Sequence, residues 1–111
     1  MNEPTIAELM DLLEKSFLPE RAGNTRGIVW FHLTGEDGGD WTVRIENQTC
    51  SATRLIPAYS DLRLEASARD IVDLFMDRLD VMRAFFTGRL KFKGDQKLAF
   101  QLASFFKIPN L

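Results

Sequence analysis

Short runs in which apolar and polar residues alternate constrain this chain most strongly, because each run predicts a β-strand with one dry face. The clearest run is 41–46, and runs 62–66 and 90–93 show the same period of two. Residues 28–33 and 50–56 are two further strand candidates. The glycine-rich, acidic segment 35–40 predicts a turn, which would join the strands on either side of it into a hairpin.

Helical spacing separates these strand candidates. Thr5 and Glu8 form a capping-box pattern ahead of an apolar series that ends before Pro19, and residues 20–26 are expected to be a loop. A middle helix is expected to begin at residue 67 or 68 and a short one after Asp80, and Asp95 is expected to cap the last helix. The residues expected to face the core from these helices are Ile71, Leu74, Phe75, Leu79, Val81, Met82, Phe85, Leu98, Leu102, Phe105 and Phe106.

The pattern therefore predicts an α+β fold with a five-stranded, mainly antiparallel sheet that helices cover on one face. The expected inward set is Val29, Phe31, Leu33, Trp41, Val43, Ile45, Leu62, Leu64, Leu90 and Phe92. Charged residues on the other face should form solvated cross-strand pairs. At 111 residues, without repeats or linkers, residues 1–111 are expected to form a single domain.

Charge and composition exclude several classes of protein. The net charge of −2 argues against a nucleic-acid partner, which needs a clustered basic footprint. No apolar run approaches the roughly 20 residues of a membrane span, and the first residues do not resemble a signal peptide. A single cysteine permits no internal disulfide. We therefore expect a cytoplasmic location.

Catalytic patterns are missing, so we expect no enzyme, metal or cofactor. His32 is the only histidine and lies in a strand, and Cys50 has no base nearby in the sequence. One histidine and one cysteine cannot supply a usual zinc set. The acidic turn 36–40 lacks the ligand spacing of a calcium loop, and no glycine-rich phosphate loop is present.

Three segments together resemble the sterol carrier protein type 2 family. The first is the glycine turn followed by an aromatic residue at 38–41, and the second is the strand that leads into a helix over 60–75. The third is the closing segment 83–95, in which Ala84-Phe85, Gly88 and a basic-apolar strand precede Gly94-Asp95. The resemblance covers about residues 6–106. It implies an apolar tunnel between sheet and helices that holds a long-chain acyl, sterol-like or isoprenoid lipid, with no catalytic step. The tunnel also offers a role for the nine phenylalanines, which otherwise indicate an ordinary aromatic core.

The candidate walls of that tunnel are apolar residues from the predicted sheet and helices. They are Phe31, Ile71, Leu74, Phe75, Met82, Phe85, Phe92, Leu102, Phe105 and Phe106. An alternative that the resemblance allows is an accessory or scaffold protein that presents a lipophilic intermediate, such as a quinone precursor, to an enzyme complex. A protein partner or a homodimer remains open. Phe100 points away from the last helix's apolar stripe, and Lys97 and Lys107 beside it suit a transient contact with an anionic membrane surface.

Overall fold

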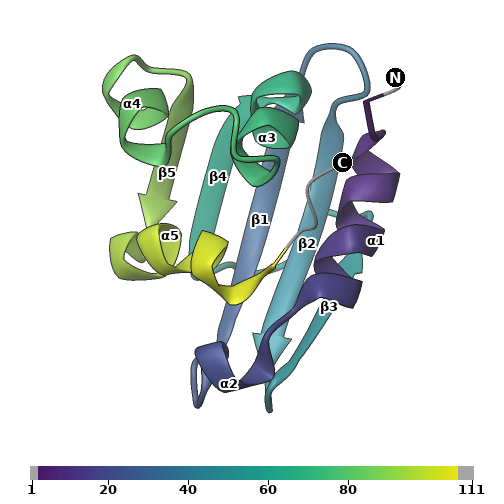
Figure 1. Cartoon of the computed structure of the whole chain (residues 1–111), viewed down its shortest axis with the longest axis vertical. Helices are drawn as coiled ribbons and strands as arrows, with labels where there is room; N and C mark the ends of the chain where they lie inside the picture. Colours follow the sequence, from purple (N-terminus) through teal and green to yellow (C-terminus); the bar gives the residue numbers. More distant parts are fainter. Residues whose placement is uncertain (1–2, 108–111) are drawn as a thin grey trace.

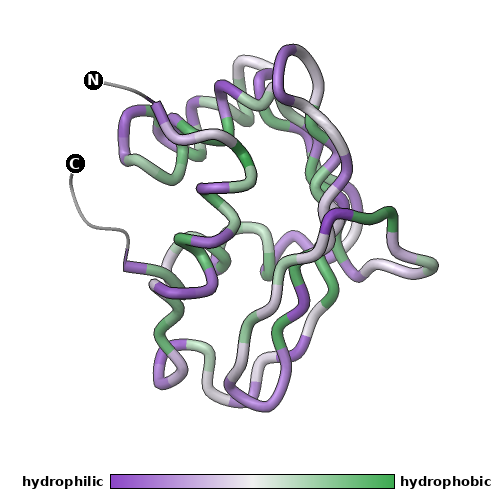
Figure 2. Tube along the Cα trace, turned by 90° about the vertical axis from the view of Figure 1, so that its right-hand side faces the viewer, coloured by the Kyte–Doolittle hydropathy of each residue, from purple (hydrophilic) through white to green (hydrophobic). Residues whose placement is uncertain are grey.

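The computed structural model describes residues 3–107 of the chain. Helices α1, α3, α4 and α5 lie over one face of a sheet (Figure 1), and Figure 2 shows the helical layer and the sheet edge-on. The elements in chain order are α1 (Ile6–Ser16), α2 (Pro19–Ala22), β1 (Gly27–Thr34), β2 (Gly39–Glu46), β3 (Thr49–Thr53), β4 (Leu62–Ser67), α3 (Ala68–Phe75), α4 (Val81–Phe86), β5 (Leu90–Gly94), α5 (Gln96–Leu102) and the 3-10 turn η1 (Ala103–Phe105).

The strands follow the order β3-β2-β1-β4-β5 across the sheet. Within the described residues three neighbouring pairs are antiparallel and one pair, β1 with β4, is parallel. The register places Phe31 between Trp41 and Leu64. The parallel pair arises because the chain between β3 and β4 crosses the uncovered face, where the hydroxyl of Thr42 donates to the carbonyl of Leu55 at 3.0 Å. The predicted sheet and its covered face are confirmed.

The turn between β5 and α5 requires glycine. Gly94 has φ 108°, and a Cβ at this position would overlap the carbonyl oxygen of Asp61. Asp95 then caps α5, since its carboxylate accepts from the backbone N–H of Leu98 at 3.0 Å. Gly88 ends α4 with φ 78°, as the sequence predicts. This closing segment therefore fixes the path of the chain from α4 through β5 into α5.

The first helix forms where the capping box places it. The hydroxyl of Thr5 accepts from the backbone N–H of Glu8 at 3.1 Å, and the Glu8 carboxylate accepts from the Thr5 N–H at 2.8 Å. α1 ends before Pro19, as predicted. Its buried residues recur at helical spacing and pack on the sheet: Ile6, Leu9, Met10 and Leu13.

Several predicted boundaries are wrong by a few residues. Helix α2 occupies part of the loop expected over 20–26, because Pro19 suits the first helical position. Helix α3 ends at Phe75, and Asp77 takes φ 61°, so Leu79 lies outside the helix. Strand β3 stops at Thr53 rather than reaching residue 56. The last helix tightens into the 3-10 turn η1 after Leu102.

Candidate functional site

An apolar pocket of about 30 Å³ lies between the sheet and helices α3, α4 and α5. No lining residue carries a charge or a titratable group. The lining residues are Leu64, Ile71, Leu74, Phe75, Val81, Leu90, Ala99, Leu102 and Ala103. Such a pocket can hold hydrocarbon but has no side chain of its own that would recognise a polar group.

Helix caps position α3 and α5, the two helices that form the longer walls of this pocket. Ser67 ends β4, and its hydroxyl accepts from the Asp70 backbone N–H at 3.0 Å, so α3 begins directly at the strand end. The Asp95 cap starts α5 directly after β5 and turns Ala99 and Leu102 toward the sheet. The small side chain of Ala99 leaves room in the wall, and this residue forms part of the pocket lining.

The structure divides the ten predicted wall residues into three groups. Phe31, Ile71, Leu102, Phe105 and Phe106 are buried. Leu74, Phe75 and Phe92 are half-buried against the core. Met82 and Phe85 are exposed. Four of the ten line the pocket itself: Ile71, Leu74, Phe75 and Leu102.

Phe75 links the sheet to the last turn through aromatic contacts. Its ring centroid lies 6.4 Å from that of Phe31 on β1 and 6.1 Å from that of Phe106. Phe106 in turn lies 5.7 Å from Phe17, and the two residues form an isolated β-bridge. These rings fill the centre of the covered face. Among them Phe75 is the one that also lines the pocket, so it lies between the pocket and the other rings.

The expected inward orientation of Met82 is wrong, and Phe85 packs on Phe92 at the edge of the sheet rather than in the pocket. Met82 is 44% exposed and Phe85 38% exposed, whereas Ala84 on the same helix is fully buried. Helix α4 has only six residues, nearly all apolar, so its sequence shows no single dry face. The small side chain of Ala84 lets the helix backbone come close to the core. Met82 and Phe86 then point outward, while Val81 lines the pocket and Phe85 stacks on Phe92.

Five pocket residues were missing from the predicted walls. Leu64 and Leu90 already belonged to the expected inward face of the sheet, and Val81 to the expected inward face of its helix. Ala99 and Ala103 were missed because a small residue gives only a weak hydrophobic signal. Their four-residue spacing, on the same face as Leu102, was the signal that could have found them.

The interior of the described structure is filled by side chains, so the expected tunnel is not seen as an open channel. Sites for ligands of drug size have volumes of roughly 300–1,000 Å³, about ten times the pocket volume or more. A bound chain would therefore have to displace side chains or a helix.

A larger depression of about 340 Å³ lies elsewhere, between the start of α1, the β1–β2 turn and the start of α3. Its rim is charged. The Arg78 guanidinium donates to Glu3 at 2.7 Å and pairs with Asp73 at 3.0 Å, and the Asp37 carboxylate accepts from the backbone N–H of Ile6 at 2.7 Å. These charges pair with one another around a floor that also contains the apolar side chains of Ile6, Ala68 and Val72.

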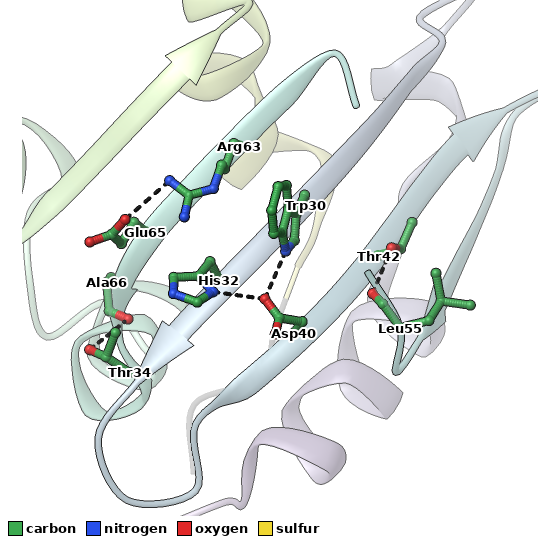
Figure 3. Close-up of polar contacts among 9 residues, drawn as sticks. All are labelled: Trp30, His32, Thr34, Asp40, Thr42, Leu55, Arg63, Glu65 and Ala66. Carbon is green, nitrogen blue, oxygen red and sulfur yellow. Dashed lines mark hydrogen bonds and ion pairs between the residues drawn. The ribbon is translucent and has the colours of Figure 1, made fainter. Parts of the chain in front are cut away.

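The uncovered face of the sheet is polar (Figure 3). The Arg63 guanidinium lies 4.8 Å from the Trp30 ring centroid, and the Trp30 indole N–H donates to Asp40 at 2.8 Å. Nδ1 of His32 lies 2.8 Å from the same Asp40 oxygen. The hydrogen bond with His32, followed by that from Trp30, lowers the pKa of Asp40. The pairs Arg63–Glu65 and Arg44–Glu46 run along single strands, contrary to the expected cross-strand pairing, whereas His32 and Asp40 meet across β1 and β2.

Cys50 is half-buried on β3, and burial, followed by the charge of Glu14, raises the pKa of its thiol to about 12. The thiol is therefore not a nucleophile at neutral pH. Within residues 3–107 no group of three His, Cys, Asp or Glu side chains is arranged to hold a metal ion. None of the described helices is long and apolar enough to cross a bilayer.

The helices on one face of the mixed sheet define a two-layer α+β domain with a small apolar pocket between the layers. Comparisons with known proteins show the family to which this domain belongs. The model of the SCP-2 sterol transfer family matches residues 6–107. The chain belongs to this family, and membership implies a role in binding or carrying lipid.

Individual proteins also match this chain in sequence. Hydroxysteroid dehydrogenase-like protein 2 of Danio rerio is 31% identical over 98 residues, which are 87% of this chain and 24% of that protein. This chain thus spans about a quarter of the length of the first curated relatives it matches.

Two solved structures match along most of both chains. The palmitated SCP2L2 of Aedes aegypti has a TM-score of 0.74 at 22% identity and covers 94% of this chain and 93% of its own. The ubiquinone synthesis protein UbiJ-SCP2 has a TM-score of 0.70 at 13% identity and covers 89% and 90%. At these identities the likeness shows the fold alone.

Proposed function

We propose that this protein binds one long-chain acyl or isoprenoid lipid between the sheet and α5 and carries it without chemical change. The observation that supports this most directly is the pocket, whose lining is wholly apolar although it lies among secondary-structure elements that also present charges. Burial of hydrocarbon contributes about 0.8 kcal/mol per methylene. A dozen methylenes would therefore supply useful affinity after the costs of ordering the chain.

A bound lipid needs more space than the pocket offers, and movement of α5 and Phe75 would provide it. Helix α5 has seven residues and lies near the end of the described chain. It holds to the sheet through Leu98, Ala99 and Leu102. Phe75 is only half-buried, and it stands between the pocket and the row of core rings. A lipid that displaced this ring would extend the pocket toward Phe31.

The test is to narrow the pocket in one variant and widen it in another. Ala99→Leu places a larger side chain in the pocket wall, whereas Phe75→Ala removes the ring between the pocket and Phe31. We expect Ala99→Leu to weaken binding of a fluorescent fatty acid, displaced with palmitic acid, by about tenfold or more. Phe75→Ala should bind at least as tightly as wild type, although it loses up to about 3–5 kcal/mol of stability.

Ala7→Leu is the matched control, because it makes the same change on the exposed side of α1. Circular dichroism should first establish that every variant is folded. Absence of saturable binding by the wild type would refute the proposed function. If Ala99→Leu binds like Ala7→Leu, the lipid lies elsewhere.

A second candidate is an accessory protein that presents a lipophilic intermediate to an enzyme complex. The fold shared with the ubiquinone synthesis protein UbiJ-SCP2 favours it, and the same pocket would serve. Native mass spectrometry after gentle purification separates the two roles. A co-purifying lipid alone supports the carrier, and a stoichiometric protein partner supports the accessory role.

A further inference from the structure

Four phenylalanines form a connected cluster at the β5 edge of the sheet, which we call the aromatic edge: Phe85, Phe86, Phe92 and Phe100. Phe85 of α4 stacks on Phe92 of β5 with ring centroids 4.9 Å apart. Phe100 of α5 lies 5.4 Å from Phe92, and Phe86 lies 5.6 Å from Phe85. The cluster thus ties together three elements that lie side by side in Figure 1.

The cluster faces outward. Phe86 is 75% exposed and Phe100 44% exposed. Met82, one turn before Phe86 on α4, is also exposed. Single exposed apolar residues are common on protein surfaces, but a contiguous group of large ones marks an interaction site.

Basic residues flank the aromatic edge, some on the side of α4 and α5 and others, Lys91 and Lys93, beside Glu65 and Arg63 on the uncovered face. Segment 83–97 contains five basic residues and one acidic residue, Asp95, whose carboxylate is used to cap α5. The chain as a whole has a net charge of −2. Neighbouring elements bring three acidic residues to this segment: Asp70 pairs with Arg89, Glu65 lies opposite Lys91, and Asp80 caps α4. Within residues 3–107, Arg89 is the one of these five that forms an ion pair, with Asp70 at 2.7 Å. The basic residues are Arg83, Arg89, Lys91, Lys93 and Lys97.

The opposite edge of the sheet, covered by α1, has a different character. The outer side of α1 carries Glu8, Asp11 and Glu14, and its Lys15 pairs with Asp11 at 2.8 Å. An anionic surface would attract the β5 edge and repel the α1 edge. The charge distribution thus defines one orientation for docking.

A second copy of the chain is a poorer occupant for the same surface. Strand β5 is an edge strand, and pairing it with another β5 would bring Lys91 and Lys93 close to the same residues of the other copy. Like charges across a strand pair are destabilising, and edge lysines are a common barrier to such pairing. Long, mobile lysine side chains are compatible with lipid headgroups.

We propose that the aromatic edge docks this protein on an anionic lipid bilayer. Phe86 and Phe100 enter the boundary between headgroups and acyl chains, and Lys97, one turn before Phe100, contacts the headgroup phosphates. Lys93 reaches the headgroups from the other face of the edge strand β5. The pocket lies directly behind this surface, because Ala99 and Leu90 line it from the same two elements as Phe100 and Phe92. Docking is independent of whether the pocket accepts lipid, and the test below does not measure pocket binding.

Vesicle co-sedimentation tests the proposal. Vesicles of phosphatidylcholine mixed with phosphatidylglycerol should bind the wild type, and vesicles of phosphatidylcholine alone should bind it weakly. Phe86→Ser should weaken binding by roughly tenfold. The double variant Lys93→Gln with Lys97→Gln should weaken it by about fivefold or more for each lysine, and added salt should reduce binding by the wild type.

The matched controls are Ile56→Ser and the double variant Lys15→Gln with Arg54→Gln. Ile56 is exposed in the segment that crosses the other face, and Lys15 and Arg54 lie toward the β3 edge. The proposal is overturned if anionic vesicles do not bind the wild type, or if the control variants lose binding as strongly as the aromatic-edge variants. Sedimentation equilibrium showing a dimer that Phe86→Ser dissociates would assign the surface to a second copy instead.

Discussion

The two edges of the sheet are covered to different depths. At one edge α1 has eleven residues and buries four large apolar side chains. At the other edge α4 has six residues, and only Ala84 of them is buried. The same sheet thus has a thick, acidic cover at one edge and a thin, aromatic, basic cover at the other. We therefore expect the α1 edge to contribute more to stability than the α4 edge.

The largest expected effect is a difference in stability between variants of α1 and variants of α4. Leu9→Ala empties a fully buried position under α1 and should lower the free energy of unfolding by about 2–5 kcal/mol. Phe86→Ala removes a larger side chain from α4 and should change the free energy of unfolding by less than about 0.5 kcal/mol. Urea denaturation of both variants measures the difference. Equal losses would mean that the α4 edge contributes to the core after all.

A smaller effect should appear in local opening. Asp95→Ala removes the cap of α5 and should cost about 1 kcal/mol. We expect amide hydrogen exchange to accelerate in α5 while α1 remains protected to the global limit. Thr5→Ala is the matched control, since it removes the cap of α1. If the amide hydrogens of α5 and α1 exchange at the same rate in the wild type, the two edges of the sheet do not differ in local stability.

The smallest effect concerns the uncovered face, where a polar network joins the three central strands β2, β1 and β4. The pKa of Asp40 is lowered by its hydrogen bonds with His32 and Trp30. Its contribution to stability is therefore complete above the ordinary aspartate pKa of about 3.9 and is lost as the pH falls through the lowered value. Wild type should exceed Asp40→Asn in stability near neutral pH, and the gap should narrow in acid. Urea denaturation at several pH values measures the difference in stability between wild type and Asp40→Asn. A difference that does not change with pH would exclude a contribution from the lowered pKa of Asp40.

Much of the sheet was predictable because its signals are local. Alternation located the strands, and Thr5, Asp80 and Asp95 were identified as helix caps from residue type and position alone. The parallel pairing of β1 with β4 was not predictable, because it depends on the path of residues 54–61 across the uncovered face. Period-two patterns do not reveal the direction of a neighbouring strand.

The site was less predictable than the fold. Ile71 and Leu102 were identified because they lie on clear helical stripes, and both line the pocket. Met82 was misplaced, and Phe85 lies on Phe92 rather than in the pocket, because a six-residue apolar helix has no preferred face until it packs. Burial of the small Ala84 decides the rotation of α4, and a hydrophobicity pattern ranks alanine below its larger neighbours.

The parallel pair at the centre of the sheet also has a consequence for the order of folding. Strands β1, β2 and β3 are consecutive antiparallel neighbours and can pair through short turns as soon as they are synthesised. Strand β4 must return to β1 across the whole of that meander, so closing this loop costs conformational entropy before any contact compensates for it. Strand β5 pairs with β4 and reaches the rest of the sheet through it, so the aromatic edge joins the sheet only when this loop closes. The surface proposed to meet the membrane thus depends on the least local strand pairing of the fold.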